Sequence, residues 1–282
     1  MTFLDQCVCC GGKSYTPLYR SLISCRDCGH TWFPQIPETP DLERIYEESY
    51  FHGEEYLDYG MERNGLERNF RQRLKVLLEL HPAGGKLFEV GCSYGYFLNL
   101  AAKHFDVSGC DISEHAVERA LGLLGPVVTR GDYLQLATQR QAVDVVCLWD
   151  TLEHLPQPDL VVAHAARHLK CGGTLALSTG DMGSFCARVR GSTWRLIHPP
   201  SHLHYFTRHS LSRLLIRCGF RIRLVRRPWF WRSAQAVAYR LLCTKHRNMM
   251  KSLYFVLQKH GCLNFCFPFN LGDLMEIYAC KP

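Results

Sequence analysis

The sequence predicts an α/β protein in which βαβ units build a parallel sheet behind a small cysteine-rich head. From residue 86 onward, short apolar segments alternate with helical ones, which is typical of a parallel sheet. Five of the fifteen cysteines lie within the first 28 residues, ahead of PQIPETP (34–40), whose prolines indicate a linker. A chain of 282 residues with 47% apolar and 21% charged residues fits one large globular domain with a small appendage.

The head, residues 1–33, carries two cysteine pairs with metal-ligand spacing. Cys7 and Cys10 form one C-x-x-C pair, and Cys25 and Cys28 form the other after fourteen intervening residues. Two such pairs predict a zinc ribbon, in which four thiolates surround Zn²⁺ tetrahedrally and metal binding drives folding. Four thiolates leave no open coordination position, so we expect this zinc to be structural. The alternative is a set of accessible thiols that hold no metal.

The remaining elements follow in order along the chain. Residues 34–82 are predicted to be the linker and a mostly helical segment that ends near Leu80, where HPAGG stops it. Strands are expected over 87–90, 107–111, 127–132, 143–149, 174–179, 221–225 and 274–280. Helices are expected over 97–104, 114–122, 159–170 and 210–218, with CGG (171–173) as a turn. In such sheets, ligands bind at the edge where the parallel strands end.

The stretch FEVGCSYGYF (88–97) runs from the first of these strands through a glycine-spaced turn into a helix. Its spacing is G-x-S-x-G over Gly91, Ser93 and Gly95, and an acid, Glu89, lies two residues ahead. A second acid, Asp111, ends the next strand, where it suits ribose hydroxyls. A carboxylate aimed into the loop repels a pyrophosphate, so this loop favours a cofactor with a positive amine or sulfonium.

Several segments together resemble class I S-adenosylmethionine-dependent methyltransferases over about residues 70–225. EVGCSYGYF resembles motif I of that family, VSGCDIS the ribose-binding segment, and VDVVCLWDTLEHLPQPDLVV with LKCGGTLALST the fourth and fifth strand regions. The resemblance implies a Rossmann-like, seven-stranded, mostly parallel sheet closed by an antiparallel C-terminal hairpin. The strand at 274–280 would insert beside the one at 221–225, within a methyltransferase domain spanning residues 83–282.

The same resemblance implies S-adenosylmethionine as the cofactor and supplies its expected contacts. It assigns the acid and the glycines of the loop to the methionine part of the cofactor, with a serine where a third glycine is usual. Asp111, which ends the second strand, would hold the ribose, and Asp132, which ends the third, would lie near adenine. Asp150, after the fourth strand, would face the gap between cofactor and substrate. The expected cofactor-binding residues are Glu89, Gly91, Ser93, Gly95, Asp111, Asp132 and Asp150.

Two histidine-containing segments are expected to reach the same edge of the sheet. His154 follows the fourth strand, and HPPSHLHYFT (198–207) contains His202 and His204. A histidine near neutral pKa suits removal of a proton from an acceptor hydroxyl, so these three are the candidate catalytic bases. Packed histidines and a three-histidine metal site are the alternatives. Residues 194–211 resemble a segment of bacterial methyltransferases that modify sugars and surface glycans, which favours a sugar hydroxyl as acceptor.

The positive charge is concentrated in one part of the chain. Its net charge is +7, yet the sixteen Lys and Arg between Met182 and Gly272 are accompanied by no Asp or Glu. This asymmetry predicts an anionic partner, and a solvated basic face is the alternative. Residues 229–270 form an aromatic and basic insertion that, by resemblance, caps the substrate pocket. An anionic nucleotide sugar, a lipid-linked glycan or a peripheral membrane surface would suit it.

Taken together, these patterns predict a methyltransferase that O-methylates a sugar, glycan or other small hydroxylated acceptor. RNA nucleobase methylation is an alternative, because certain ribosomal-RNA methyltransferases resemble this chain in their zinc ribbon. Against it, the chain has no Asn/Asp-Pro-Pro-Tyr/Phe motif. Sugar C-methylation is a further alternative. It is less favoured, because sugar C-methyltransferases carry an additional C-terminal domain that is not present in this sequence after Pro282. A non-catalytic zinc-ribbon binding protein is another alternative. With no export signal and no apolar run of membrane-spanning length, we expect a cytoplasmic protein.

Overall fold

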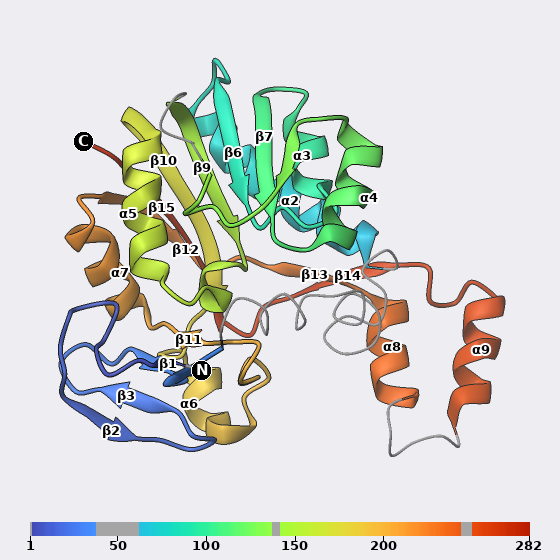
Figure 1. The fold of residues 1–282 in the computed structure, drawn as a ribbon. Helices are drawn as coiled ribbons and strands as arrows, with labels where there is room; N and C mark the ends of the chain where they lie inside the picture. The colour runs from blue at the N-terminus through green and yellow to red at the C-terminus, as the bar shows by residue number, and fades with distance from the viewer. Residues whose placement is uncertain (1, 38–61, 137–141, 244–249) are drawn as a thin grey trace.

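The computed structural model describes residues 2–37, 62–136, 142–243 and 250–282. Figure 1 shows an α/β body, the N-terminal head beneath it, and a pair of helices that extends to one side. A mostly helical segment was predicted over 41–82, of which residues 41–61 lie outside the described residues. The described part forms α2 (Arg63–Leu80), which ends where expected. Among the described residues, no helix is both long and apolar enough to cross a membrane.

A seven-stranded sheet forms the centre of the body, in the order β12-β15-β10-β9-β6-β7-β8. Its strands are β6 (Lys86–Val90), β7 (Asp106–Asp111), β8 (Val128–Arg130), β9 (Val143–Trp149), β10 (Leu169–Gly180), β12 (Arg221–Arg226) and β15 (Leu274–Cys280). The strands from β8 to β10 pair in parallel, whereas β15 runs antiparallel between β10 and β12. The predicted fold class is therefore confirmed, including insertion of the last strand.

Helices cover both faces of this sheet (Figure 1). One core contains residues of α2, α3 (Tyr96–Ala101) and α4 (Glu114–Leu124), and the other contains residues of α5 (Pro158–His168) and α7 (Arg208–Arg217). Alternate residues of β9 belong to different cores, because successive side chains of a strand point to opposite faces of the sheet. Val145 and Cys147 belong to the first core, and Val146 and Leu148 to the second.

Several predicted boundaries differ from the structure, and the helix expected over 159–170 ends at His168 because β10 already begins at Leu169. CGG, expected as a turn, lies inside β10, whose register with β9 shifts between Leu169 and Thr174. Gly172, with a φ of 78°, helps to form this bulge, so the glycines bend the strand without ending it. Within the predicted linker, β5 (Gln35–Ile36) pairs antiparallel with β1 (Thr2–Phe3).

The head is joined to the body by a shared sheet. This four-stranded sheet has the order β11-β4-β3-β2, built from β2 (Tyr15–Pro17), β3 (Ile23–Cys25), β4 (Thr31–Trp32) and β11 (His204–Tyr205). Trp32 of the head and Phe206 of the body belong to the same apolar core. The domain boundary expected at residue 33 stays a prediction, and both the sheet and the core extend across it.

The insertion at 229–270 forms an arm, which we define as β13 (Phe230–Ser233), α8 (Ala234–Leu242), α9 (Lys251–Lys259) and β14 (Cys266–Phe269). The two strands pair antiparallel, with Phe230 opposite Phe269. The aromatic sequences at the two ends of the insertion therefore meet in one ribbon, and the helices lie beyond it (Figure 1).

Candidate active site

The loop between β6 and α3 has three residues in the left-handed region. Gly91, Ser93 and Gly95 have φ values of 71°, 49° and 73°. Glycine adopts this region freely, whereas a serine there costs about 1–2 kcal/mol. The backbone N–H of Ser93 donates to Oδ2 of Asp111 at 2.8 Å, which offsets part of that cost. The loop therefore keeps a glycine-like path although its middle residue is serine.

The two glycines of this loop are also required by close packing. A Cβ at Gly91 would lie 2.6 Å from Cγ2 of Thr151, and one at Gly95 would lie 2.6 Å from Cδ1 of Leu124. Gly91 thus lets the loop approach the segment after β9, and Gly95 lets α3 pack against α4.

Glu89 lies near the end of β6 and is 2% exposed. Its Oε2 is buried and accepts no hydrogen bond from the described residues, and the same holds for the hydroxyl of Ser93. Burial raises the pKa of the Glu89 carboxyl well above its usual range, against the opposing effect of Arg73. A buried carboxyl oxygen is costly until a donor reaches it. An ammonium group close to the loop would be such a donor.

Asp111, the last residue of β7, and Asp132, which follows β8, lie at the same edge of the sheet. Asp111 accepts the backbone N–H of Ser93 on Oδ2 and that of Ser113 on Oδ1, at 2.8 and 2.9 Å. Burial raises the pKa of Asp111, and these backbone donors oppose the shift. Each carboxylate oxygen has a second lone pair, so Asp111 is oriented and still able to accept from a hydroxyl. Asp132 accepts the N–H of Leu134 at 3.0 Å.

Asp150 follows β9 with a φ of 53° and is held on both oxygens. Oδ1 accepts the hydroxyl of Ser178 at 2.9 Å, and Oδ2 accepts Arg73 at 2.9 Å. Arg73, from α2, also donates to Glu276 of β15 at 3.1 Å, and its guanidinium lies 4.8 Å from the ring centroid of Trp149. Burial disfavours the charge of Arg73, but Asp150 and Glu276 outweigh burial and raise its pKa. This arginine therefore joins α2 to the edge of the sheet where Asp150 lies.

Sequence reasoning missed Arg73, although a signal was present. The residue lies on the buried stripe of α2 together with Asn69, Phe70 and Leu77. An arginine on an otherwise apolar helix face must find an ionic partner, because a buried unpaired charge is strongly unfavourable. Its partners, 77 and 203 residues away in sequence, could not be identified from local pattern.

Two of the three candidate bases lie side by side. His154 ends η3 (Leu152–His154), which begins two residues after Asp150, and its ring meets that of His202 edge-on at a centroid distance of 4.5 Å. The ring of His198, which was not among the candidates, also meets that of His202, at a centroid distance of 5.6 Å. Nδ1 of His154 donates to the carbonyl of Ser201 at 2.8 Å, so the neutral ring carries its basic nitrogen at Nε2. Burial, with His154 and His198 nearby, lowers the pKa of His202 well below its usual value.

The structure does not bring His204 to this pair. His204 is 1% exposed, and its Nδ1 lies 3.1 Å from Nε2 of His30 in the head. Its ring stacks against His30 and Phe206, with centroids at 5.3 and 6.0 Å. Burial lowers the pKa of His204 to about 4. The residue therefore packs in the seam between head and body.

Glu153 precedes His154 and is almost fully buried. Burial and the neighbouring charge of Asp150 raise the pKa of this carboxyl to about 8. The backbone carbonyl of Glu153 accepts the N–H of Leu203 at 2.8 Å, which holds η3 against the segment that carries His202. At neutral pH this carboxyl therefore favours its protonated form.

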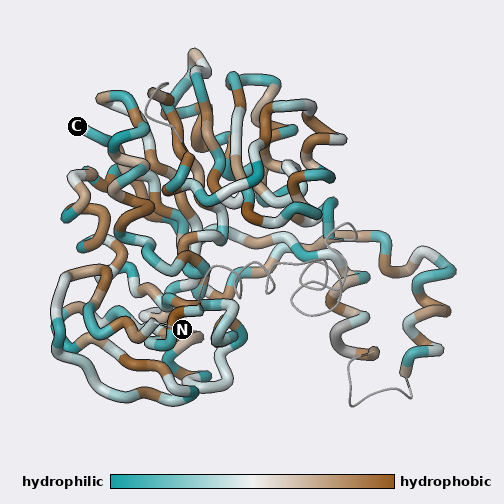
Figure 2. Tube along the Cα trace, viewed as in Figure 1, coloured by the Kyte–Doolittle hydropathy of each residue, from teal (hydrophilic) through white to brown (hydrophobic). Residues whose placement is uncertain are grey.

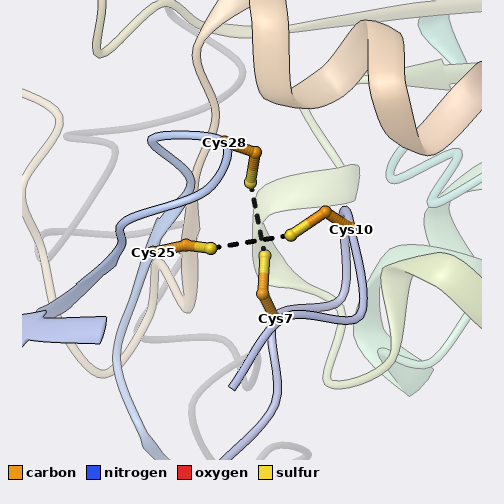
Figure 3. A group of neighbouring side chains, drawn as sticks. All are labelled: Cys7, Cys10, Cys25 and Cys28. Carbon is orange, nitrogen blue, oxygen red and sulfur yellow. Dashed lines mark hydrogen bonds between the residues drawn. The ribbon is translucent and has the colours of Figure 1, made fainter. Parts of the chain in front are cut away.

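The four head cysteines converge on one point, as Figure 3 shows. The sulfurs of Cys7, Cys10, Cys25 and Cys28 all lie within 4.8 Å of one another, with Cys7 3.5 Å from Cys28 and Cys10 3.6 Å from Cys25. Four sulfurs at about 2.3 Å from one Zn²⁺ in tetrahedral geometry have this kind of spacing. Among the described residues, no other group of three or more such side chains has metal-binding spacing, so the histidine pair and His198 do not form one.

Comparison with known proteins agrees with this geometry. Residues 61–225, more than half of the chain, match the family model described as a methyltransferase domain. A ubiquinone biosynthesis O-methyltransferase from Dechloromonas aromatica is 30% identical over 135 residues, which cover 45% of this chain and 58% of that protein. The chain thus spans just over half the length of this curated relative.

Solved structures share the fold at low sequence identity. A SAM-dependent methyltransferase from Thermotoga maritima has a TM-score of 0.56 at 19% identity, covering 86% of this chain and 100% of its own. The magnesium protoporphyrin IX methyltransferase from Synechocystis, with bound SAH, also has a TM-score of 0.56, at 15% identity, covering 87% of this chain and 100% of its own. At these identities the likeness is one of fold.

Proposed function

We propose that this chain, which belongs to the methyltransferase-domain family, is an S-adenosylmethionine-dependent methyltransferase that O-methylates a sugar, glycan or other small hydroxylated acceptor. The observation that carries the proposal is the arrangement at the carboxyl edge of the sheet. There, the loop at 91–95 and Asp150 lie next to η3, which brings His154 against His202.

We assign the cofactor contacts to residues of this edge. S-adenosylmethionine, when bound, supplies an electrophilic methyl group on a positive sulfonium. Oε2 of Glu89, which has no hydrogen-bond partner among the described residues, suits its ammonium group, and the close approach permitted at Gly91 and Gly95 suits its methionine part. Asp111, oriented by two backbone donors, suits the ribose hydroxyls. Asp132 is assigned to the adenine end, one strand further along the edge.

We assign the base to His154, with His202 as the residue that orients it. The basic nitrogen of His154 is Nε2, and this atom would take the proton of the acceptor hydroxyl. His202 has a lowered pKa, so it stays neutral beside the imidazolium that forms and does not repel it. His204 is enclosed by His30 and Phe206, and we assign it to the seam between head and body.

Two acceptor classes are supported by different observations. Residues 194–211 resemble sugar and glycan methyltransferases, and the basic stretch between Met182 and Gly272 suits an anionic acceptor. The curated relatives named for ubiquinone biosynthesis favour a hydroxylated intermediate of that biosynthesis as the second candidate. RNA is supported only by the basic stretch and the cysteine pairs.

We further propose that the head binds one structural Zn²⁺ through Cys7, Cys10, Cys25 and Cys28. The support is the convergence of four sulfurs within 4.8 Å. The backbone N–H of Gly12 points at the sulfur of Cys10 at 3.4 Å, and such donors stabilise a metal-bound thiolate. All four positions would be filled by protein, so the ion would have no catalytic role.

A label-transfer assay tests the acceptor. The purified chain is incubated with methyl-labelled S-adenosylmethionine and separate fractions of nucleotide sugars, lipid-linked glycans, small polar metabolites and RNA. Label in a sugar or glycan fraction supports the first acceptor class. Label in RNA contradicts hydroxyl methylation of a small acceptor.

Histidine variants then test the catalytic assignment. His154→Ala is expected to lower turnover by roughly 100-fold or more, with unchanged affinity for S-adenosylhomocysteine. His209→Ala, at an exposed position on α7, is the matched control and should keep full activity. If His154→Ala and His202→Ala both keep the full rate, neither histidine is the base.

A further inference from the structure

The arm is held away from the body on a fixed base (Figure 1). The side chain of Asn69, on α2, accepts the N–H of Trp231 at 2.7 Å and donates to its carbonyl at 3.1 Å. The guanidinium of Arg68 lies 4.6 Å from a ring centroid of the same tryptophan. At the far end of the ribbon, α8 and α9 pack through Tyr239 and Tyr254, whose ring centroids are 5.2 Å apart.

The surface of α9 is apolar where it faces solvent. Leu253, Phe255 and Val256 are 44%, 57% and 52% exposed, although such side chains are normally buried. Phe265, which directly precedes β14, is also 56% exposed. Figure 2 shows hydrophobic residues along both helices of the arm. A helix that is apolar on its solvent side needs a partner to cover it.

The charge of this segment is of one sign. Residues 229–271 contain six Lys and Arg and no Asp or Glu. Two of these, Lys251 and Lys259, are exposed at the two ends of α9 and bracket its apolar run. Lysines at the ends of an apolar helix can extend to anionic headgroups while the middle of the helix contacts acyl chains.

These observations favour one kind of partner over two others. Phosphates of a nucleic acid would complement the lysines but would leave Leu253 and Val256 uncovered. A second copy of the chain would bring another arm of the same positive charge, which repels the first. An anionic bilayer surface satisfies both the apolar and the charged groups.

We propose that the arm docks the protein on the surface of an anionic lipid bilayer, with Leu253, Phe255 and Val256 entering the headgroup region and Lys251 and Lys259 contacting lipid phosphates. The docking does not depend on which acceptor is methylated, so its test is separate from that of the proposed function.

Vesicle sedimentation with the full chain tests this proposal. The protein should pellet with vesicles of phosphatidylcholine and phosphatidylglycerol, and much less with phosphatidylcholine alone. Phe255→Gln/Val256→Gln should lower the partition coefficient at least roughly tenfold, because both side chains lose apolar burial. Lys251→Glu should lower it by about fivefold or more, and added salt should weaken binding. Ile216→Gln, which removes a side chain 62% exposed on α7, is the matched control and should bind like the wild type.

Three outcomes would overturn the proposal. The first is equal binding to both kinds of vesicle or binding to neither. The second is wild-type binding by Phe255→Gln/Val256→Gln, provided that circular dichroism shows the variant to be folded. The third is a wild-type dimer in light scattering that this double variant converts to a monomer, which would make the arm an interface between copies.

Discussion

Replacing Arg73 with methionine keeps an unbranched side chain but removes the charge and the N–H donors of the guanidinium. In the structure those donors reach Glu276 at 3.1 Å and Asp150 at 2.9 Å, and the guanidinium lies over Trp149. The substitution therefore separates α2 from two acids at once, on β15 and after β9.

The size of the effect follows from what remains around Glu276. Its side chain is 3% exposed, so it cannot turn to water when its partner is removed. Arg226 stays at 3.8 Å from its other oxygen, and the hydroxyl of Tyr278 donates to it at 3.3 Å. Removing one partner of a buried ion pair costs about 3–5 kcal/mol, and these contacts place the expected loss near 3 kcal/mol. Asp150 is 37% exposed, so solvent screening makes its added contribution small.

Urea unfolding followed by circular dichroism measures this loss. Arg71→Met is the matched control, since Arg71 lies on the same helix, is 57% exposed and pairs with Glu67 at the surface. It should change the free energy of unfolding by less than about 0.5 kcal/mol. Adding Glu276→Gln to Arg73→Met should cost less than the sum of the two single changes. A loss below about 1 kcal/mol for Arg73→Met would refute the reasoning that the pair is buried and uncompensated.

The remaining predictions concern the cofactor edge, the head and the seam. Asp111→Asn should weaken S-adenosylhomocysteine binding by roughly ten- to a hundredfold in calorimetry, because charged acceptors contribute about 1.5–3 kcal/mol; unchanged affinity would contradict the ribose assignment. Metal analysis should give one zinc per chain, and Cys28→Ser should lose the zinc and lower the melting temperature, because metal binding contributes to folding; a zinc-free chain with the same melting temperature would contradict the ribbon. The pKa of His204 is lowered in the fold from 6.5 to about 4, so below pH 6.5 the unfolded chain takes up a proton that the folded one refuses. The free energy of unfolding should therefore fall as pH drops from 6.5 towards 4, by about 2 kcal/mol at pH 5, and His204→Gln should remove this part of the pH dependence.

The body of the fold could be predicted because its signals are local. β9 and β15 have the predicted bounds, 143–149 and 274–280, since each is a mostly apolar segment, interrupted only by Asp144 in β9 and Glu276 in β15. The strand expected from residue 174 begins at Leu169 as β10. Its start was predicted too late because a pair of glycines usually marks a turn. The pairing with β9, which keeps Gly172 within a bulged strand, leaves no signal in the local sequence.

The site was predictable where its residues follow strand ends, and less so where it depends on distant pairing. Parallel topology places the ends of β6, β7, β8 and β9 along one edge of the sheet. The loop from Glu89 to Gly95 lies at this edge, together with the acids at the ends of the other three strands, Asp111, Asp132 and Asp150. His202 and His204 are two residues apart, yet only the first lies against His154. The difference arises because β11 pairs with β4, so His204 faces the head, and that pairing across more than 170 residues leaves no local signal.

The pairing of β11 with β4 also bears on how the chain can be divided. A fragment beginning after residue 37 would leave His204–Tyr205 as an open strand edge and would uncover apolar residues such as Phe206. Such a fragment would be prone to aggregate, even though its central sheet is intact. The head therefore cannot be exchanged as an independent cassette, and thermal melting of the whole chain should show head and body unfolding in a single cooperative transition.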